Sequence, residues 1–511
     1  MLDSRASGIL LHPTSLPSRF GIGDLGENAY KFVDFLANSD QQVWQILPIG
    51  PTGFGNSPYL SYSALAGNPL LISPEILHGQ GLLTQQELDR TPEFSLDRVD
   101  FDRVITTKIP LLRLASDRFK AQASEEDNEK FKRFCNSQND WLSDYALFMS
   151  LKQAHNGSGW NQWPSDIASR HPEALAKWSV ELAEEIDFHK FVQYQFFCQW
   201  KNLKKYANQK GIKIFGDIPI YVAHDSVDVW ANSDIFCLDP ETGEAKLMAG
   251  VPPDYFSSTG QLWGNPVYDW TQLQKTDFKW WIRRVECILE YVDIIRIDHF
   301  RGFQAYWAVP QNETTAMKGT WLDAPGDEFF QLLEKQLGRL PIVAEDLGVI
   351  TPEVEALRDK FNFPGMKILQ FAFDDDRTNG FLPYNYERNC IVYTGTHDNN
   401  TSVGWFYERS PEAQARVVDY LGCVGDDGIH WALIRLALGS VGNTVVLPFQ
   451  DVLGLGTDAK MNTPSQPTGN WSWRCRVEAF NEELSGRLKY LTYLYGRTPI
   501  NNEQWTMDNG Q

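Results

Sequence analysis

The chain has 511 residues, of which 42% are hydrophobic and 22% are charged, a composition typical of a globular protein. Its 46 basic and 66 acidic residues give a formal net charge of −20, which argues against nucleic acid or an anionic membrane as a partner. Seven cysteines without a CxxC pair favour reduced thiols over a disulfide framework or a zinc site. No signal peptide is recognisable, and no stretch approaches the roughly 18 apolar residues of a membrane span, so we expect a cytoplasmic protein.

Short apolar runs alternate with helix-like stretches along the chain, the pattern of a barrel or open sheet of parallel strands. The first two runs lie at residues 8–12 and 43–49, with an amphipathic helical pattern at 27–37 between them. The later candidate strands lie at residues 212–217, 293–298, 341–346, 366–373, 390–397 and 444–449. Eight candidate strands predict an α/β fold of the (β/α)8 TIM barrel type.

Two long excursions interrupt this pattern. Residues 74–210 are polar and helix-patterned, so we expect a helical subdomain inserted after the second strand. Residues 223–270 follow the third strand and are rich in Trp, Tyr, Pro and Gly, a composition typical of a lid or a binding loop. The predicted organisation is therefore a first part of the barrel in residues 1–73, the helical insert in 74–210, and the rest of the barrel in 211–511.

Four of the predicted strands end in carboxylates, at the edge where α/β folds build active sites. These residues are Asp217, Asp298, Glu345 and Asp398. Arg296 lies two residues before Asp298, so both side chains point to the same face of a strand. The guanidinium should therefore lower the pKa of Asp298 and keep it ionised. Glu345 follows an apolar run, so partial burial should raise its pKa and keep a proton available.

Two carboxyl groups with pKa values pushed apart are the equipment for cleaving glycosidic bonds, and they lie about 5–5.5 Å apart in retaining enzymes. A metal site is the competing interpretation, because Asp, Glu and His also bind Mg²⁺ or Zn²⁺, but Arg296 disfavours a cation there. Any one of these residues alone could be a solvated charge at a strand end. That explanation does not account for all of them together. His12, at the end of the first strand, and Tyr59, after a Gly-rich stretch, are further candidates for the barrel mouth, each with a structural role as the alternative.

A series of longer segments carries a closer likeness. In chain order they are ASGILLHPTSLPS, WQILPIGPTGFGNSPY, FGDIPIYV, GVPPDYFSSTGQLWGNP, IIRIDHFRGF, VAEDLG, YTGTHDN and GNWSWR. Together they resemble segments of the amylomaltase family (4-α-glucanotransferase, disproportionating enzyme) of the α-amylase superfamily, nearly end to end. The departures are small: Phe54, for example, stands where some relatives carry Tyr.

The resemblance implies a cytoplasmic enzyme that transfers α-1,4-glucan segments between maltooligosaccharides. We expect no cofactor and no metal, and the sequence does not decide between a monomer and a small homo-oligomer. The resemblance also implies that Asp298 is the nucleophile, Glu345 the general acid/base and Asp398 the carboxylate that stabilises the transition state. Residues 250–257 resemble the family's mobile loop that covers the glucan. The residues that we expect to bind the glucan are Tyr59, Asp217, Asp254, Phe256, Trp263, Arg296 and His397.

Two alternatives stay open at this point. A hydrolase of the same superfamily would use the same three carboxylates with water as the acceptor, and only the whole-chain likeness favours transfer. A non-catalytic glucan-binding protein is less favoured, because such a binder would usually have lost one of Asp298, Glu345 or Asp398, and all three are present.

Overall fold

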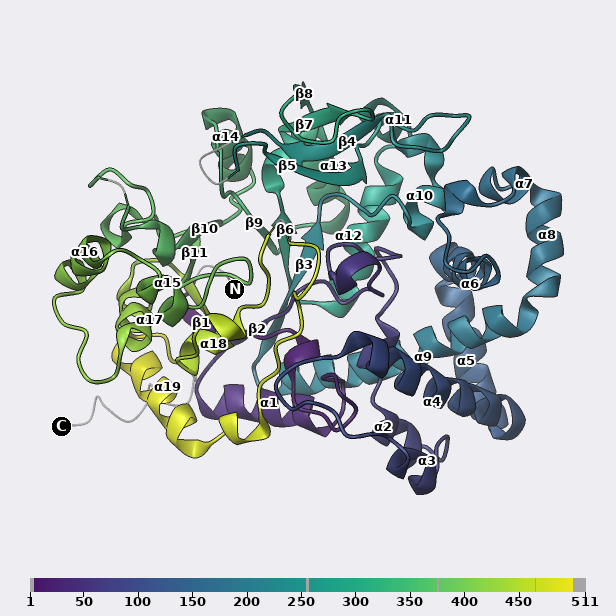
Figure 1. The fold of residues 1–511 in the computed structure, drawn as a ribbon, viewed down its shortest axis with the longest axis horizontal. Coiled ribbons are helices and arrows are strands. Elements are labelled where there is room, and N and C mark those ends of the chain that lie inside the picture. The colour runs from purple at the N-terminus through teal and green to yellow at the C-terminus, as the bar shows by residue number, and fades with distance from the viewer. Residues whose placement is uncertain (1–3, 254–256, 375, 465, 500–511) are drawn as a thin grey trace.

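Eight parallel strands form a nearly closed barrel at the centre of the molecule (Figure 1). The computed structural model describes residues 4–253, 257–374, 376–464 and 466–499. The strands of the barrel are β1 (Ala6–Leu10), β2 (Val43–Gln45), β3 (Lys213–Pro219), β6 (Ile294–Asp298), β9 (Ile342–Ala344), β10 (Gly365–Ile368), β11 (Cys390–Tyr393) and β12 (Thr444–Pro448). They lie in the order β10-β11-β12-β1-β2-β3-β6-β9, and neighbouring strands are parallel. The predicted (β/α)8 barrel is thereby confirmed.

The barrel strands are buried on both faces, which explains why their sequences are largely apolar. A polar pair lies inside the barrel, where the Tyr393 hydroxyl donates to Gln45 Oε1 at 2.9 Å and so satisfies both buried groups. Several strands are shorter than expected: β2 ends at Gln45, and β9 spans only Ile342–Ala344. β10 ends at Ile368 and gives way to a 3-10 turn at Leu369–Phe371, and β11 ends at Tyr393.

The barrel closes between β9 and β10, the two ends of the sheet order, and we call this junction the seam. The Ala344 amide donates across the seam to the Pro364 carbonyl at 2.9 Å. Asp346, just after β9, accepts a hydrogen bond from the Met366 amide at 2.7 Å. Gly365 leaves room for this carboxylate, since a Cβ atom there would lie 2.3 Å from Asp346 Oδ2. The seam is thus held by a side chain as well as by main-chain bonds.

A group of helices, α2 to α9, separates β2 from β3 in the sequence and projects to one side of the barrel, blue in Figure 1. Its members are α2 (Pro74–Gly79), α3 (Gln85–Asp89), α4 (Phe101–Gln122), α5 (Glu125–Ser137), α6 (Asn139–Ala154), α7 (Ser165–Ala168), α8 (Pro172–Glu181) and α9 (Ala183–Gln209). Capping side chains begin four of them: Ser73, Thr84, Asp100 and Ser124. Fully buried Lys108 on α4 donates to the Leu70 carbonyl at 2.7 Å and so ties the group to the barrel loops.

A second, antiparallel sheet lies beside the barrel, at the top of Figure 1. Its strands are β4 (Leu247–Val251), β5 (Gln261–Pro266), β7 (Ala305–Pro310) and β8 (Thr320–Asp323), in the order β5-β4-β7-β8. Two of these strands come from the expected excursion at residues 223–270, and the other two follow β6. The lid-like excursion therefore holds paired strands, and the sequence analysis did not predict the segment after β6 that completes the sheet.

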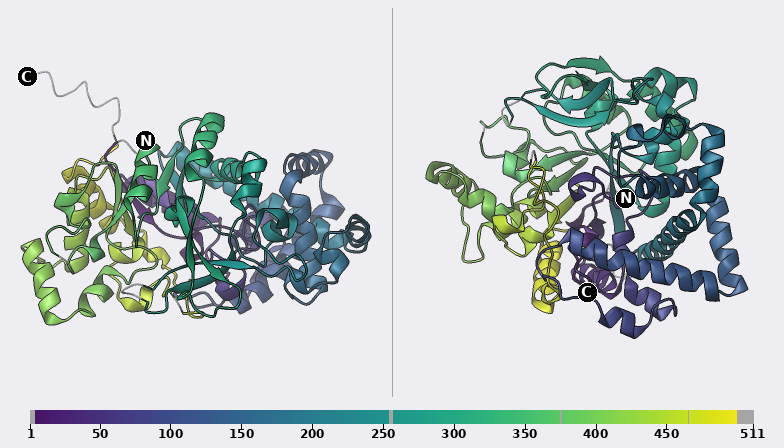
Figure 2. Two further views of the ribbon diagram at one scale, coloured as in Figure 1. Left: turned by 90° about the horizontal axis from the view of Figure 1, so that it is seen from above. Right: turned by 45° about the vertical axis from the view of Figure 1, so that its right-hand side comes forward.

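The remaining helices surround the barrel. They are α1 (Glu27–Asn38), α10 (Val227–Ala231), α11 (Trp270–Lys275), α12 (Lys279–Tyr291), α13 (Gly326–Leu337), α14 (Pro352–Lys360), α15 (Ser402–Tyr407), α16 (Pro411–Leu421), α17 (Ile429–Gly439), α18 (Phe449–Val452) and α19 (Glu482–Leu494). Figure 2 shows the green and yellow helices of the C-terminal part at the opposite end of the molecule from the blue helical group. Within the described part of the chain, no helix is both long and apolar enough to cross a membrane.

Candidate active site

The carboxyl ends of the barrel strands gather the charged residues that the sequence analysis singled out. Asp217 in β3 is the register partner of Arg296 in β6, and Asp298 is the last residue of β6. Glu345 follows β9 directly, and Asp398 lies in the loop after β11. Because these strands are parallel, their ends meet at one rim of the barrel, where active sites of this fold are built.

Arg296 lies at the centre of this group, and its side chain is 4% exposed. Its Nη1 donates to both carboxylate oxygens of Asp217, at 2.8 and 2.7 Å. Its Nη2 lies 2.8 Å from Asp298 Oδ1. One guanidinium therefore bridges two carboxylates with charge-assisted bonds. The two-residue spacing along β6 places Arg296 and Asp298 on one face, in agreement with the alternation of a strand.

The ionisation of Asp298 differs from the expectation. Burial raises the pKa of its carboxyl to about 6; Arg296 opposes this shift, and the charge of Asp217 adds to it. The prediction that the guanidinium holds this pKa low is therefore wrong, because Arg296 is shared with Asp217 and burial outweighs it. The Asp298 side chain keeps 30% of its surface exposed, so a substrate can still reach it.

Glu345 is held by the main chain on both of its carboxylate oxygens. Oε2 accepts from the His299 N–H at 2.7 Å, and Oε1 accepts from the Leu347 N–H at 3.1 Å. His299 adopts the left-handed conformation, with φ of 56°, where the chain turns out of β6. Burial raises the pKa of Glu345 to about 8, with Arg296 opposing and the charge of Asp298 adding to the shift. The two carboxyls thus titrate apart, Glu345 above Asp298.

A hydrogen-bonded chain continues from Arg296 to Asp398. The Tyr59 hydroxyl donates to Asp217 Oδ2 at 2.8 Å and lies 2.8 Å from His397 Nε2, whose proton it can accept. His397 Nε2 also lies 3.4 Å from Asp398 Oδ2. The rings of Tyr59 and His397 stack with centroids 5.3 Å apart. The Asp217 side chain is fully buried, so its contacts are with Arg296 and Tyr59 rather than with the open rim.

Trp263 of β5 reaches the same region from the small sheet. Its ring stands edge-to-face against that of His299, with centroids 4.8 Å apart. Asp254 and Phe256, which were expected to face the glucan, lie outside the described residues. Among the residues that the structure does describe, no group of three His, Cys, Asp or Glu side chains is placed to hold a metal ion.

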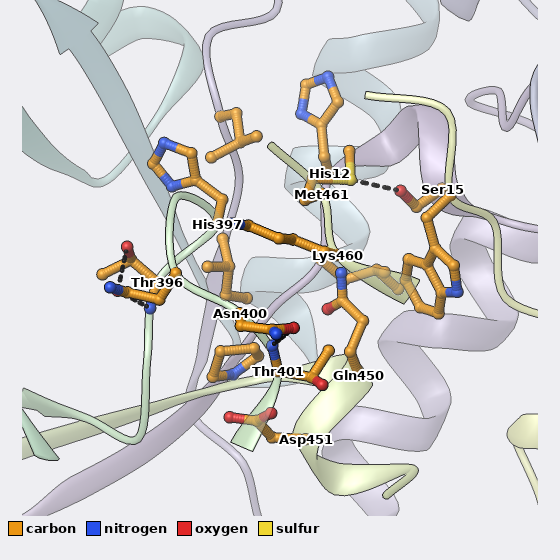
Figure 3. A pocket seen from close by; sticks show the side chains of 16 residues that line it. His12, Ser15, Thr396, His397, Asn400, Thr401, Gln450, Asp451, Lys460 and Met461 are labelled. Atoms are coloured by element: carbon orange, nitrogen blue, oxygen red, sulfur yellow. Dashed lines mark hydrogen bonds between the residues drawn. The ribbon is translucent and has the colours of Figure 1, made fainter. Parts of the chain in front are cut away.

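A cavity of about 20 Å³ lies beside His397 and is lined by His12, Gln450 and Lys460 (Figure 3). It has room for about one water molecule. Figure 3 shows the Lys460 side chain extending toward His397. Burial, helped by the nearby His397, lowers the pKa of His12 to about 3, so this imidazole is neutral. His12 therefore lies beside this rim of the barrel as an uncharged group.

Two residues of the site were not singled out from the sequence. Asn462 Nδ2 donates to Asp398 Oδ1 at 2.6 Å and holds this carboxylate by its second oxygen. Trp471 packs against Tyr59 and His397, with centroids 5.9 and 6.0 Å away, and its backbone is left-handed at φ of 63°. The segment GNWSWR contains Trp471, but nothing in its spacing shows that the chain after β12 folds back over the barrel.

The sequence and the fold both match known proteins. The profile of a family described as 4-alpha-glucanotransferase matches residues 11–479. A 4-alpha-glucanotransferase from Synechocystis is 62% identical over 499 residues, covering 97% of this chain and 99% of that protein. One from Thermus thermophilus is 49% identical over 492 residues, covering 95% of this chain and 97% of that protein.

Solved structures agree with this match. The fold is similar to that of an amylomaltase from Streptococcus agalactiae in complex with acarbose, with a TM-score of 0.94 and 40% identity over 97% of this chain and 100% of that chain. An amylomaltase from Corynebacterium glutamicum has a TM-score of 0.79 at 18% identity, over 96% of this chain and 75% of that chain, which shows the fold alone. The first likeness spans nearly the whole chain, helical group included.

Proposed function

The chain belongs to the 4-alpha-glucanotransferase family, and on this premise we propose that it works by a retaining double displacement with Asp298 as the nucleophile. As a 4-alpha-glucanotransferase, the enzyme moves α-1,4-glucan segments between maltooligosaccharides. To this activity we add a covalent intermediate, two inversions at the anomeric carbon, and a role for each side chain. A hydrolase with the same carboxylates is the alternative that an acceptor assay distinguishes.

The pairing of Asp298 with Glu345 is the observation that carries this proposal. Asp298 is ion-paired to Arg296 and has the lower pKa, so it is the group that is ionised and can attack. Glu345 has the higher pKa, so it keeps a proton near neutral pH and can donate it. The His299 N–H ties Glu345 to the residue after Asp298, which holds the two residues in the same part of the rim. A nucleophile and an acid whose pKa values lie apart suit a retaining enzyme.

In the first step, Glu345 protonates the leaving glycosidic oxygen while Asp298 attacks the anomeric carbon. The glycosidic bond breaks, and a covalent β-glucosyl ester forms on Asp298. In the second step, Glu345 is a carboxylate and takes the proton from the 4-hydroxyl of an incoming glucan, whose oxygen displaces Asp298. Two inversions restore the α configuration. Asp398 accepts hydrogen bonds from sugar hydroxyls, which strengthen as positive charge develops on the ring.

Aromatic and basic side chains around the carboxylates would hold the sugar at the cleavage point. Tyr59 presents a ring for stacking, since its hydroxyl is already bonded to Asp217. His397 lies between Tyr59 and Asp398, in reach of the same sugar. Trp263 offers a wall on the acceptor side, next to His299. We assign Asp254 and Phe256 to the loop that covers the glucan, as the family resemblance implies. Arg296 and Asp217 act by orienting their neighbours.

We place the enzyme in the cytoplasm and treat residues 74–210 as a helical subdomain inserted into the barrel. All seven cysteines lie in the described part of the chain and none of them forms a disulfide, which suits a reducing compartment. The acidic net charge of −20 suits a neutral glucan partner better than nucleic acid or an anionic membrane. Helices α4 to α9 pack on one another, as expected of a unit with its own apolar contacts.

Incubation of the pure protein with maltotriose tests the proposed function. Transfer predicts glucose together with a ladder of longer maltooligosaccharides, with no matching rise in reducing ends. Glucose and maltose with rising reducing ends would instead identify water as the acceptor and favour the hydrolase. An unchanged substrate would indicate a glucan-binding protein. Retention is checked separately by the anomeric configuration of the first-formed product, and an inverted product would exclude the double displacement.

A further inference from the structure

Each of the three guanidinium nitrogens of Arg296 has a polar partner, and one of these partners is a sulfur atom. Nη1 donates to Asp217 and Nη2 pairs with Asp298, as described above. The remaining group, Nε, donates to the Met366 thioether at 3.4 Å. Met366 is 2% exposed, so no solvent can replace this acceptor. The orientation of the guanidinium is therefore defined from three sides, two charged and one neutral.

The uncharged Met366 thioether affects how strongly the Arg296 charge pairs with Asp298. A thioether is a weak, polarisable acceptor without charge, so it can hold Nε in place while leaving the positive charge to the two carboxylates. A third carboxylate at this position would compete for Arg296 and weaken its pairing with Asp298. A purely apolar side chain would leave a buried N–H without a partner, and the guanidinium could then gain a hydrogen bond only by moving.

Met366 is itself anchored to the strand that carries Glu345. Its amide donates to Asp346 Oδ1 at 2.7 Å, and Asp346 is the residue directly after Glu345. The other oxygen of Asp346 accepts from Arg358 Nη1 at 2.5 Å, which fixes the carboxylate from outside the barrel. Met366 thus connects the seam behind Glu345 with the guanidinium that pairs with Asp298.

We propose that Met366 is a positioning residue of the transfer reaction, whose thioether holds Arg296 in the orientation that pairs it with Asp298. The proposal rests on the proposed role of Asp298 as nucleophile. Met366 is buried and makes its polar contacts with Arg296 and Asp346, so its effect belongs to the ionisation and placement of Asp298 rather than to glucan binding.

Two substitutions separate the hydrogen bond from the packing. Met366→Leu keeps a similar volume, a change that cores tolerate well, but removes the acceptor. Met366→Gln keeps the length and supplies an amide oxygen as acceptor. We expect Met366→Leu to lower kcat for maltotriose by about tenfold with KM within about twofold, and to move the acidic limb of the pH profile upward, because Asp298 loses part of its pairing. Met366→Gln should recover most of kcat and the wild-type limb.

Ile368→Val, a conservative change at a buried position of the same strand, is the matched control and should leave both quantities unchanged. The proposal would be overturned if Met366→Leu kept the wild-type kcat and the wild-type acidic limb of the pH profile. Equal losses of kcat in the Leu and Gln variants would also overturn it. If Met366→Leu does not fold, Met366→Gln decides: a wild-type limb supports the proposal, and a shifted limb in a folded Gln variant overturns it. Failure of the proposed function itself would show in the wild-type protein, as the absence of transfer from maltotriose.

Discussion

The protonation states of Asp298 and Glu345 govern the working pH range at the scale of single residues. Asp298 must be ionised to attack, so activity should fall as the pH drops below about 6, where it gains a proton. Glu345 must be protonated to donate, so activity should fall as the pH rises above about 8. Measured kcat/KM for maltotriose should therefore be bell-shaped, falling about tenfold per pH unit outside these limits. A profile that stays flat down to pH 4 would contradict the raised pKa of Asp298.

Glu345→Gln separates the acid role from the nucleophile. The amide cannot donate a proton to the leaving oxygen, so transfer from maltotriose should fall by about 100-fold to 10,000-fold. An α-glycosyl fluoride needs no proton for departure, so it should still load Asp298, and the glycosyl-enzyme should accumulate as a mass increase of the protein. With this donor, the alkaline limb of the pH profile should disappear, because Glu345 no longer has to donate a proton. Asp298→Ala is the control and should abolish turnover of both donors.

Much of this residue-level chemistry follows from the sequence, and one part does not. Apolar runs ending in Asp217, Asp298 and Glu345 were enough to predict that these residues gather at one rim, and the order of the two pKa values was expected. The level of the Asp298 pKa was not. Sequence neighbours show that Arg296 is close, but the burial of the site and the second carboxylate on Arg296 arise from β3, about eighty residues away.

At the scale of elements, the small sheet brings Trp263 to the rim of the barrel, where its ring contacts that of His299. If its ring favours a sugar over water, Trp263→Ala should raise the ratio of hydrolysis to transfer by about fivefold to tenfold, the worth of one aromatic contact. The measurement compares reducing ends with the product ladder from maltotriose. Trp178→Ala, the same change on helix α8, should leave the ratio unaltered. An unchanged ratio in Trp263→Ala would remove this ring from the exclusion of water.

The strands of the barrel and those of the small sheet differ in how well the sequence predicts them. Barrel strands are apolar on both faces, so each run stands out locally. β5 reads QLWGNP, with a glycine and a proline that favour a loop, and it is only partly buried. Its partner β4 pairs with it through a register shift between Met248 and Gly250. β4 also pairs with β7, about sixty residues further along the chain, and no local pattern predicts that pairing.

For the molecule as a whole, Arg497 fastens the C-terminal part of the chain to the barrel. Its side chain is fully buried and donates to five main-chain carbonyls, those of Ala6, Leu438, Ser440, Gly442 and Asn443. Arg497→Ala should therefore lower the free energy of unfolding by about 3 kcal/mol or more, since several buried acceptors lose a charged partner at once. Denaturant unfolding followed by circular dichroism measures this change.

Arg476→Ala provides the comparison for that experiment. Arg476 pairs with Asp97 at 2.7 Å, but both side chains are more than half exposed, so its loss should cost no more than about 1 kcal/mol. Arg497→Lys should recover only part of the stability. The planar guanidinium reaches five carbonyls, and a single ammonium group cannot reach all of them. Equal effects at the two arginines would show that the buried network adds nothing.

The seam between β9 and β10 gives the barrel a place where it can open locally without coming apart. β9 has three residues, and among the described strands it forms its ladder with β6 alone, so its amides should exchange with solvent sooner than those of β3 or β12. Glu345 leaves β9 directly, whereas Asp298 ends β6, which would keep its ladder with β3 if β9 came free. A fluctuation that frees β9 would therefore carry the acid away from a nucleophile that stays in place. On warming, this local opening should abolish activity at a temperature below that at which the barrel unfolds.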